Sequence, residues 1–359
     1  MNYSFLYPII RHGLFSAILL SLPVGLQALT STAHTPSLGG IELIVDPYRE
    51  TAIGLPLHRA AVAIAEVTDV KLIQDVQGDF VSLRLELNRS IGSPGRYGLN
   101  ADTGMPAYYL EIVTGAAAGE RLRIVANGSD WVMVEDELQG VLSASYNPTA
   151  DRDRVRIRPC WTLDSVLPAS SAPLSAQIEP SRDADALILH DQLFIQRFLD
   201  SADNSYYWAE WVSDEPSLAD DYSILPGQVT RVRRAANGDS IAFALTGDAT
   251  AFAPVWQMPT PAAGTVLEWP FSLTESVPVT LNDSGLGSVF VPAVSAAERQ
   301  DELIVWANQT GFYARPAKRF YLQDTGANLV WRELGDTITD QGSYPLEPGK
   351  AYTIRRRGE

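Results

Sequence analysis

Cysteine and histidine are scarce in this chain of 359 residues, which contains one cysteine and four histidines. A single cysteine excludes an intramolecular disulfide, so the fold must depend on its core. Cys160 lies between Pro159 and Trp161 in an apolar context, which predicts a buried side chain rather than a reactive thiol. Zinc is not expected, because the chain has no cysteine pair and no His-x-x-x-His spacing.

Basic residues are outnumbered as well. The chain carries 27 lysines and arginines against 43 aspartates and glutamates, a formal net charge of −16 at pH 7. This balance argues against nucleic acid as a partner, because nucleic acid requires a basic footprint, and against docking on anionic lipid. Hydrophobic residues at 46% and charged residues at 19% are typical of a globular protein with room for about two domains.

Long apolar runs are confined to the N-terminus. Arg11 precedes the apolar run Leu14–Leu22, and the small residues Ser31 and Ala33 fit a cleavage site. Residues 1–33 are therefore predicted to be a signal peptide, and an uncleaved anchor is the alternative. We expect an exported protein, whether periplasmic, cell-surface or secreted, with no membrane span after cleavage.

Long amphipathic helices are missing too. Short alternating runs recur between Gly, Pro, Asn and Asp residues, and this pattern predicts an all-β fold. Phe80–Leu87 alternates cleanly, Tyr108–Val113 and Arg121–Val125 read as the strands of a hairpin, and Val155–Arg158 alternates again. Strands at this spacing predict a small barrel or sandwich over residues 35–160.

The rest of the chain, residues 161–359, is predicted to be a duplicated β domain with copies at about 161–250 and 271–359. An offset of 110 residues (301 − 191) relates two pairs of segments, Asp191–Ile195 with Asp301–Val305 and Trp161–Leu163 with Phe271–Leu273. The two Pro-Gly turns are 122 residues apart (348 − 226), which predicts insertions in loops. Two copies favour a pseudo-twofold pair of β units.

Several short motifs follow one another in a distinctive order. They are Tyr108–Gly115 with Gly119 and Asn127, Trp161–Leu163, Thr280–Leu286, Asp301–Leu303, Trp331-Arg332 and Pro348-Gly349. In this order they resemble a family of exported bacterial proteins of uncharacterised function, some of which carry a C-terminal sorting segment. The resemblance implies export and this two-part layout, and it implies no activity, cofactor or catalytic residue.

Aromatic residues gather in the first copy, where Tyr206, Tyr207, Trp208 and Trp211 lie close together. Strand alternation places Tyr206 and Trp208 on one face and Tyr207 on the other. An exposed aromatic face can stack on sugar rings, so these four residues form a candidate ligand-binding site. Core packing between the copies is the alternative, and it is favoured because the second copy keeps aromatics at the same place.

Acidic residues occur in pairs that can be read in three ways. The pairs are Asp151 with Asp153, Asp183 with Asp185, Asp214 with Glu215, and Asp220 with Asp221. Two facing acids can hydrolyse a glycosidic bond, whereas solvated turn residues have no role beyond solubility. Calcium is the third reading, because it takes hard oxygen ligands. Its candidate ligands are Asp183 and Asp185, and a second candidate place is Asn282-Asp283.

Catalytic constellations are otherwise absent from the sequence. His34, His58 and His190 remain after cleavage, and no Gly-x-Ser-x-Gly motif accompanies them. No catalytic residue is predicted. We expect an exported, non-enzymatic structural or adhesive β protein of the cell envelope or extracellular space, with a polysaccharide or another envelope protein as partner. The alternatives are a carbohydrate-binding module that uses the aromatics and a hydrolase that acts on a polysaccharide.

Overall fold

The computed structural model describes residues 38–47, 49–74, 80–115, 117–135, 152–181, 184–189, 193–212, 215–225, 227–235, 239–249, 261–306 and 315–358. Strands make up 52% of it and helix 3%, which confirms the predicted all-β class. The described residues include the helical turns α2 (Leu163–Val166) and η1 (Leu286–Ser288). None of the helices in these ranges is long and apolar enough to cross a membrane. The predicted signal peptide, His34 and His190 lie outside the described residues.

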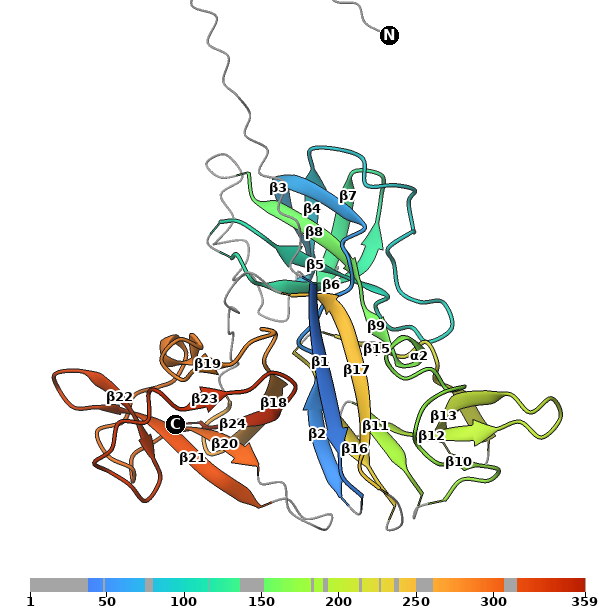
Figure 1. Cartoon of the computed structure of the whole chain (residues 1–359). Helices are drawn as coiled ribbons and strands as arrows, with labels where there is room; N and C mark the ends of the chain where they lie inside the picture. The colour runs from blue at the N-terminus through green and yellow to red at the C-terminus, as the bar shows by residue number, and fades with distance from the viewer. Residues whose placement is uncertain are drawn as a thin grey trace, which may run out of the picture. The chain divides into compact units, whose positions relative to one another are not determined.

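Six strands between Ala63 and Pro159 close into a small barrel in the order β3-β4-β7-β6-β5-β8 (Figure 1). They are β3 (Ala63–Gln74), β4 (Phe80–Leu87), β5 (Tyr108–Ile112), β6 (Arg121–Asn127), β7 (Trp131–Glu135) and β8 (Arg154–Pro159). The alternation of side chains favours closure, because each strand then buries its apolar face inside the barrel, away from water. Leu83, Leu85 and Leu110 are fully buried there. A barrel is one of the two forms, barrel or sandwich, predicted for residues 35–160; it spans residues 63–159, and the strands at Leu38–Val45 and Glu50–Gly54 pair in other sheets.

The first described strand lies outside this barrel. β1 (Leu38–Val45) pairs antiparallel with β17 (Ile241–Asp248), so that Leu38 lies opposite a residue 210 positions away (248 − 38). Leu43 and Val45 of this ribbon are buried in the same core cluster as the first of the two larger sheets. The two strands of this ribbon are far apart in the sequence, and their apolar sides are buried only when they come together.

The first larger sheet has the order β14-β13-β12-β11-β16-β2, and β10 adds to β12 in parallel. Its strands are β2 (Glu50–Gly54), β10 (Ala176–Gln177), β11 (Ala186–Leu189), β12 (Leu193–Leu199), β13 (Tyr206–Val212), β14 (Glu215–Leu218) and β16 (Val229–Arg233). A separate short pair joins β9 (Trp161–Thr162) to β15 (Ser223–Ile224). Leu187, Ile195 and Trp208 are fully buried on the core side of this sheet.

The second larger sheet has the order β18-β24-β20-β21-β22. Its strands are β18 (Val266–Ser272), β20 (Asp301–Trp306), β21 (Pro316–Asp324), β22 (Leu329–Glu333) and β24 (Ala351–Arg357). A short pair again accompanies the sheet, formed by β19 (Val279–Thr280) and β23 (Pro345–Leu346). Leu303, Phe320, Trp331 and Ile354 pack in its core.

The two sheets share a pattern of strand pairing. β11 lies between β12 and β16 in the first sheet, as β20 lies between β21 and β24 in the second. Trp208 of β13 and Trp331 of β22 hold like positions, and the backbone carbonyl of each accepts an N–H at 2.9 Å from a residue farther along the chain. β2 takes the edge position that β18 takes in the second sheet, although it comes from the N-terminal part of the chain.

A buried acid–arginine pair holds the same place in each pattern. Asp185 Oδ1 accepts a hydrogen bond from Arg234 Nε at 3.2 Å, and Asp301 accepts from Arg356 through both carboxylate oxygens at 2.8 and 2.7 Å. In each pair Oδ2 also accepts a backbone N–H from ten residues upstream, at 2.8 Å (185 − 175) and at 2.7 Å (301 − 291). Asp185 and Asp301 therefore make contacts of the same kinds in the two sheets.

The strand register groups these segments differently from the offset of 110 residues read from the sequence. Asp185–Leu189 corresponds to Asp301–Val305, an offset of 116 residues (301 − 185), whereas Leu193–Ile195 begins the next strand, β12. Likewise β9 and β19 each pair with a short strand that precedes a Pro-Gly sequence, whereas Phe271 and Ser272 belong to β18. Two apolar runs that begin with Asp lie six residues apart in the first half, and only hydrogen bonding tells them apart.

Candidate functional site

Charged side chains collect on one face of the second sheet because of strand alternation. In β20, Leu303 and Val305 belong to the core cluster, so Glu302 points to the opposite face. Arg355 of β24 lies directly opposite Glu302 in the register, and Arg357 follows two residues later on the same face. Arg319 of β21 lies opposite Ile304, which places it diagonally across from Glu302.

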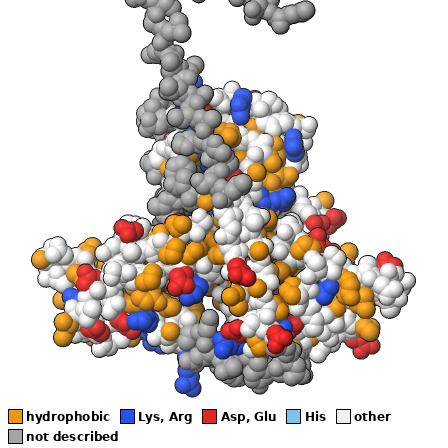
Figure 2. All heavy atoms as spheres, viewed as in Figure 1, with side chains coloured by type: hydrophobic (Ala, Val, Ile, Leu, Met, Phe, Trp, Pro, Cys, Tyr) orange, Lys and Arg blue, Asp and Glu red, His pale blue; other side chains and the backbone are white. Residues whose placement is uncertain are grey.

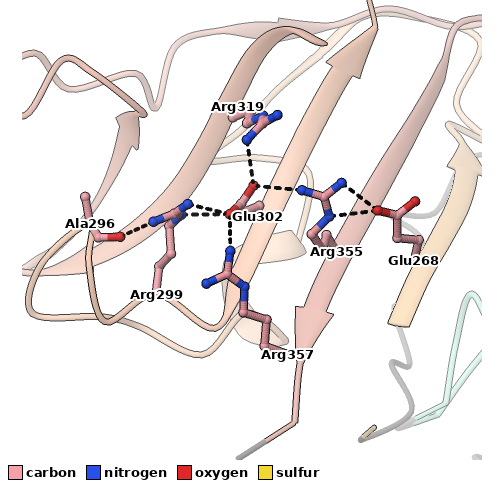
Figure 3. A network of polar contacts seen from close by, with 7 residues as sticks. All are labelled: Glu268, Ala296, Arg299, Glu302, Arg319, Arg355 and Arg357. Atoms are coloured by element: carbon pink, nitrogen blue, oxygen red, sulfur yellow. Dashed lines mark hydrogen bonds and ion pairs between the residues drawn. The ribbon is translucent and has the colours of Figure 1, made fainter. Parts of the chain in front are cut away.

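One carboxylate lies at the centre of this group, which we call the Glu302 cluster: Glu302 with Arg299, Arg319, Arg355 and Arg357 (Figure 3). Oε1 of Glu302 contacts Nη2 of Arg299 at 2.7 Å and Nη2 of Arg357 at 3.4 Å. Oε2 lies 3.8 Å from Nη1 of Arg355 and 3.9 Å from Nη1 of Arg319. The contacts are therefore tight on Oε1 and loose on Oε2.

Two of the arginines also contact groups other than Glu302. Arg355 donates from Nε to Glu268 Oε1 at 2.8 Å, and its Nη2 lies 2.6 Å from the same oxygen. Arg299 donates from Nη1 to the backbone carbonyl of Ala296 (Figure 3). These contacts orient both guanidinium groups toward the cluster.

The cluster carries an excess of positive charge. Its four arginines, counted together with Glu302 and with Glu268 beside Arg355, sum to +2 (4 − 2), in a chain whose formal net charge is −16. Figure 2 shows acidic and basic side chains interspersed on the face of the molecule that it displays. The side chains of Arg357 and Arg319 are 45% and 36% exposed, whereas that of Glu302 is 2% exposed. Solvent therefore reaches the cations more than it reaches the central anion.

The first sheet shows that the fold does not require this cluster. Glu50 and Arg233 form a cross-strand ion pair of 3.2 Å there, as Glu268 and Arg355 do in the second sheet. Ala186, however, takes the position of Glu302, and Phe194 takes the position of Arg319. The guanidinium of Arg233 lies 5.2 Å from the centre of the Phe194 ring. The buried glutamate and its ring of arginines are thus specific to the second sheet.

The structure places Tyr206, Tyr207 and Trp208 of the predicted aromatic site in different environments. Trp208 is fully buried and donates from Nε1 to the carbonyl of Leu167 at 2.7 Å, so it belongs to the core and the platform prediction is wrong for this residue. Tyr207 is half-buried and stacks on Phe198. Tyr206 is exposed, with the guanidinium of Arg197 at 4.0 Å from its ring centre. Trp211 lies in β13, and its side chain is outside the described part of the structure.

The predicted calcium ligands are occupied by other partners. Asp185 accepts from Arg234 and from the backbone N–H groups of Ser175 and Ala235, so both of its carboxylate oxygens have partners within the protein. Asp183 lies outside the described residues. At the second candidate place, Asp283 accepts from the hydroxyl of Thr280 at 2.5 Å. Within the described ranges, no three His, Cys, Asp or Glu side chains are grouped to hold a metal ion.

Three of the four acidic pairs considered for hydrolysis each have one member outside the described ranges, namely Asp151, Asp183 and Asp214. Asp220 accepts a hydrogen bond from the backbone N–H of Trp208 at 2.9 Å. Burial raises the pKa of Asp220, and the charge of Asp164 adds to this effect. Asp220 therefore supports the strand that carries Trp208.

A second polar network, missed from the sequence, is buried beside the barrel. His58 Nδ1 and the Tyr109 hydroxyl share a hydrogen bond of 2.6 Å. Arg158 of β8 donates to Glu111 at 2.8 Å and to Asp248 at 2.7 Å. The alternating arginines of residues 155–158 and the glutamate inside an apolar strand were the available signals. The network joins β5 and β8 of the barrel to the end of β17.

Burial shapes the protonation of these groups. It lowers the pKa of His58 well below 6.5, and the charges of Arg121 and Arg158 lower it further. Burial also raises the pKa of the Cys160 thiol to about 12, so the thiol stays protonated and unreactive near neutral pH. The prediction that Cys160 is buried is confirmed.

The lowered pKa of His58 predicts that the protein loses stability in mild acid. Its pKa is lowered in the folded protein, so below about pH 6.5 the unfolded chain takes up a proton that the folded chain does not. This contribution is fully present above pH 6.5 and falls by up to about 1.4 kcal/mol per pH unit below it. Urea unfolding between pH 7.5 and 5.5 measures the slope. His58→Gln is the control and should flatten the slope; an unchanged slope would contradict the assignment.

Comparison with known proteins gives no match from which a function could be inferred. No protein-family model matches the chain, and no match was found among curated proteins or solved structures. The resemblance to a family of exported bacterial proteins stays a prediction.

Proposed function

We propose that this is an exported, non-enzymatic adhesive β protein that binds an anionic ligand through the Glu302 cluster. The observation that carries the proposal is the +2 excess of four arginines over Glu302 and Glu268, in an otherwise acidic chain. Guanidinium groups present several N–H donors in a planar fork, which suits carboxylate and sulfate oxygens. The counterpart position in the first sheet lacks the cluster, so a role in folding alone does not account for it.

The buried glutamate also suits a binding role. Four arginines at close quarters repel one another, and Glu302 offsets part of that repulsion while no ligand is bound. Arg319 and Arg357 keep exposed guanidinium groups, and their contacts to Glu302 are longer than those of Arg299. Both can therefore turn toward a ligand at small cost.

Two further proposals concern the chain as a whole. The first is export, which is supported by the pattern of residues 1–33. The second is that residues 161–359 contain two copies of one β unit, and the matched acid–arginine pairs and tryptophans support it. A carbohydrate platform built on aromatics has less support, because Trp208 lies in the core.

Removal of charge from the cluster should abolish most of the binding. The double variant Arg319→Gln/Arg355→Gln is expected to weaken binding of oligogalacturonate at least about tenfold, since each lost charge-assisted hydrogen bond is worth roughly 1.5–3 kcal/mol. Isothermal titration calorimetry of the full chain at low and moderate salt measures the change.

Arg231→Gln/Arg233→Gln is the matched control, because these arginines flank Glu50 at the corresponding place in the first sheet. The control should bind like the unaltered protein. The proposal fails if the unaltered protein binds no anion from a panel of oligogalacturonate, dextran sulfate and polyglutamate, or if both double variants lose binding to the same extent.

A further inference from the structure

A pocket of about 260 Å³ lies at the end of β20, beside the turn at Pro348-Gly349. Pockets that hold drug-sized ligands begin at about 300 Å³, so this one suits a smaller molecule. We propose that it binds one ring of a neutral sugar. Its lining and the Glu302 cluster share no residue of the described part of the chain, so this site is separate from the one assigned to an anionic ligand.

Three aromatic side chains line the pocket, and contacts with the protein fix their positions. Trp306 donates from Nε1 to Oγ1 of Thr353 at 2.9 Å. Tyr344 packs against the core of the second sheet, and the hydroxyl of Tyr352 accepts the N–H of Glu347 at 2.6 Å. Trp306 and Tyr344 are half-buried, so each keeps surface for a ligand. Aromatic rings attract the C–H groups of a sugar ring, and side chains that are already fixed lose little entropy on binding.

A β-bulge brings Trp306 to this pocket. Val305 lies opposite Lys318 in the register. Trp306, the next residue, lies opposite Pro316, which leaves Ala317 as the extra residue of the bulge. Neighbours in a regular strand point to opposite faces, yet Val305 and Trp306 both line the pocket. Ala317 also lines it, is exposed and adds only a methyl group, so little of the space is filled from that side.

The turn at Pro348-Gly349 places an acid and a base side by side in the lining. Gly349 has a φ of +77°, as the third residue of a type II turn requires, and Pro348 suits the second position. Glu347 and Lys350 are therefore the first and last residues of the turn, and Lys350 Nζ lies 2.5 Å from Glu347 Oε2. Their side chains are 55% and 48% exposed for Lys350 and Glu347, and an ion pair this exposed contributes little, so a ligand can exchange its contacts at small cost.

This pair favours hydroxyl groups over a ligand that carries charge. A hydroxyl can donate to a carboxylate and accept from an ammonium group, so two neighbouring hydroxyls can bond to Glu347 and Lys350 together. The two charges cancel, and a charged ligand would be attracted by one of them and repelled by the other. The other Pro-Gly sequence is flanked by Leu225 and Gln228, so such a turn does not require the charged pair. Aromatic walls beside a neutral donor–acceptor pair describe a site for an uncharged sugar.

Saturation-transfer difference NMR of the full chain tests the pocket with the methyl glycosides of glucose, galactose, mannose and N-acetylglucosamine. We expect at least one of the four to bind with a dissociation constant in the millimolar range, which a single ring with a few hydrogen bonds can reach. Glucuronate and glucosamine, which carry one charge each, should bind no tighter than methyl glucoside.

Two substitutions locate the bound sugar. Ala317→Phe should weaken binding at least about tenfold, because its phenyl group takes the space of the sugar ring. Thr68→Phe is the matched control, since Thr68 is the exposed extra residue of a bulge in the barrel. Lys350→Met should weaken binding about fivefold or more through loss of its hydrogen bond to a hydroxyl. Lys71→Met is the control here, because Lys71 is 52% exposed and its Nζ lies 2.7 Å from Glu86.

The proposal falls if none of the four glycosides binds the unaltered protein, or if a folded Ala317→Phe protein binds as tightly as the unaltered one. Equal losses in Ala317→Phe and Thr68→Phe would place the sugar elsewhere and overturn it as well. Tighter binding of glucuronate or glucosamine than of methyl glucoside would mean that the pocket selects a charge. Circular dichroism checks that each variant is folded, and Lys350→Met with its control decides the matter if Ala317→Phe is not.

Discussion

Replacement of Arg158 by methionine should lower the free energy of unfolding by about 3–5 kcal/mol, the range found when one partner of a buried ion pair is removed. Arg158 is 3% exposed and bonds to Glu111 and Asp248, which are themselves buried. Burial works against its positive charge, but the two carboxylates outweigh this, so the pKa of Arg158 is raised. Methionine would leave both carboxylates without their shared cation.

Urea unfolding followed by circular dichroism and tryptophan fluorescence measures this loss. Arg123→Met is the matched control in the same barrel, because Arg123 pairs with Glu135 at 3.7 Å and both side chains are well exposed. It should change the free energy of unfolding by less than about 1 kcal/mol. Equal effects of the two substitutions would mean that the buried network does not hold the barrel to β17.

Replacement of Trp208 by alanine should cost about 3–5 kcal/mol, as expected for a large aromatic side chain lost from a core. Trp208 is fully buried, and its removal also leaves the carbonyl of Leu167 without the indole N–H at 2.7 Å. Both the cavity and the unpaired carbonyl destabilise the folded state.

Tyr206→Ala is the control for this substitution. Tyr206 is 38% exposed and is the first residue of the same strand. Loss of its side chain should therefore lower the free energy of unfolding by less than about 1 kcal/mol. Thermal and urea unfolding of both variants provide the comparison. A stable Trp208→Ala protein that loses polysaccharide binding would instead restore the aromatic platform and contradict the assignment of Trp208 to the core.

The sequence by itself determined the class of fold and much of the barrel. The alternation of Phe80–Leu87 and the hairpin of Tyr108–Val113 with Arg121–Val125 predicted strands that the structure confirms as β4, β5 and β6. Such features are local, because side-chain alternation depends only on backbone geometry and on which face is apolar. The burial of Cys160 followed from its apolar neighbours in the same way.

Strand partners were decided by the tertiary structure. Ile41–Val45 was readable as a strand, but its partner β17 begins some 200 residues later in the chain (241 − 45 = 196). Alternation shows which side of a strand is apolar and leaves open which strand lies beside it. For the same reason the internal match was assigned to the run at Asp191, whereas the hydrogen-bonded register selects the run at Asp185.

The candidate site shows most clearly which features the sequence determines and which the tertiary structure decides. Glu302 was visible inside an apolar strand, and Arg355 and Arg357 were visible at the end of the chain, but they lie more than fifty residues apart (355 − 302 = 53). Composition and local pattern determined an acidic all-β protein. Only the pairing of β20 with β24 and β21 brought Arg319, Arg355 and Arg357 to Glu302, because cross-strand register is set by packing of the whole sheet.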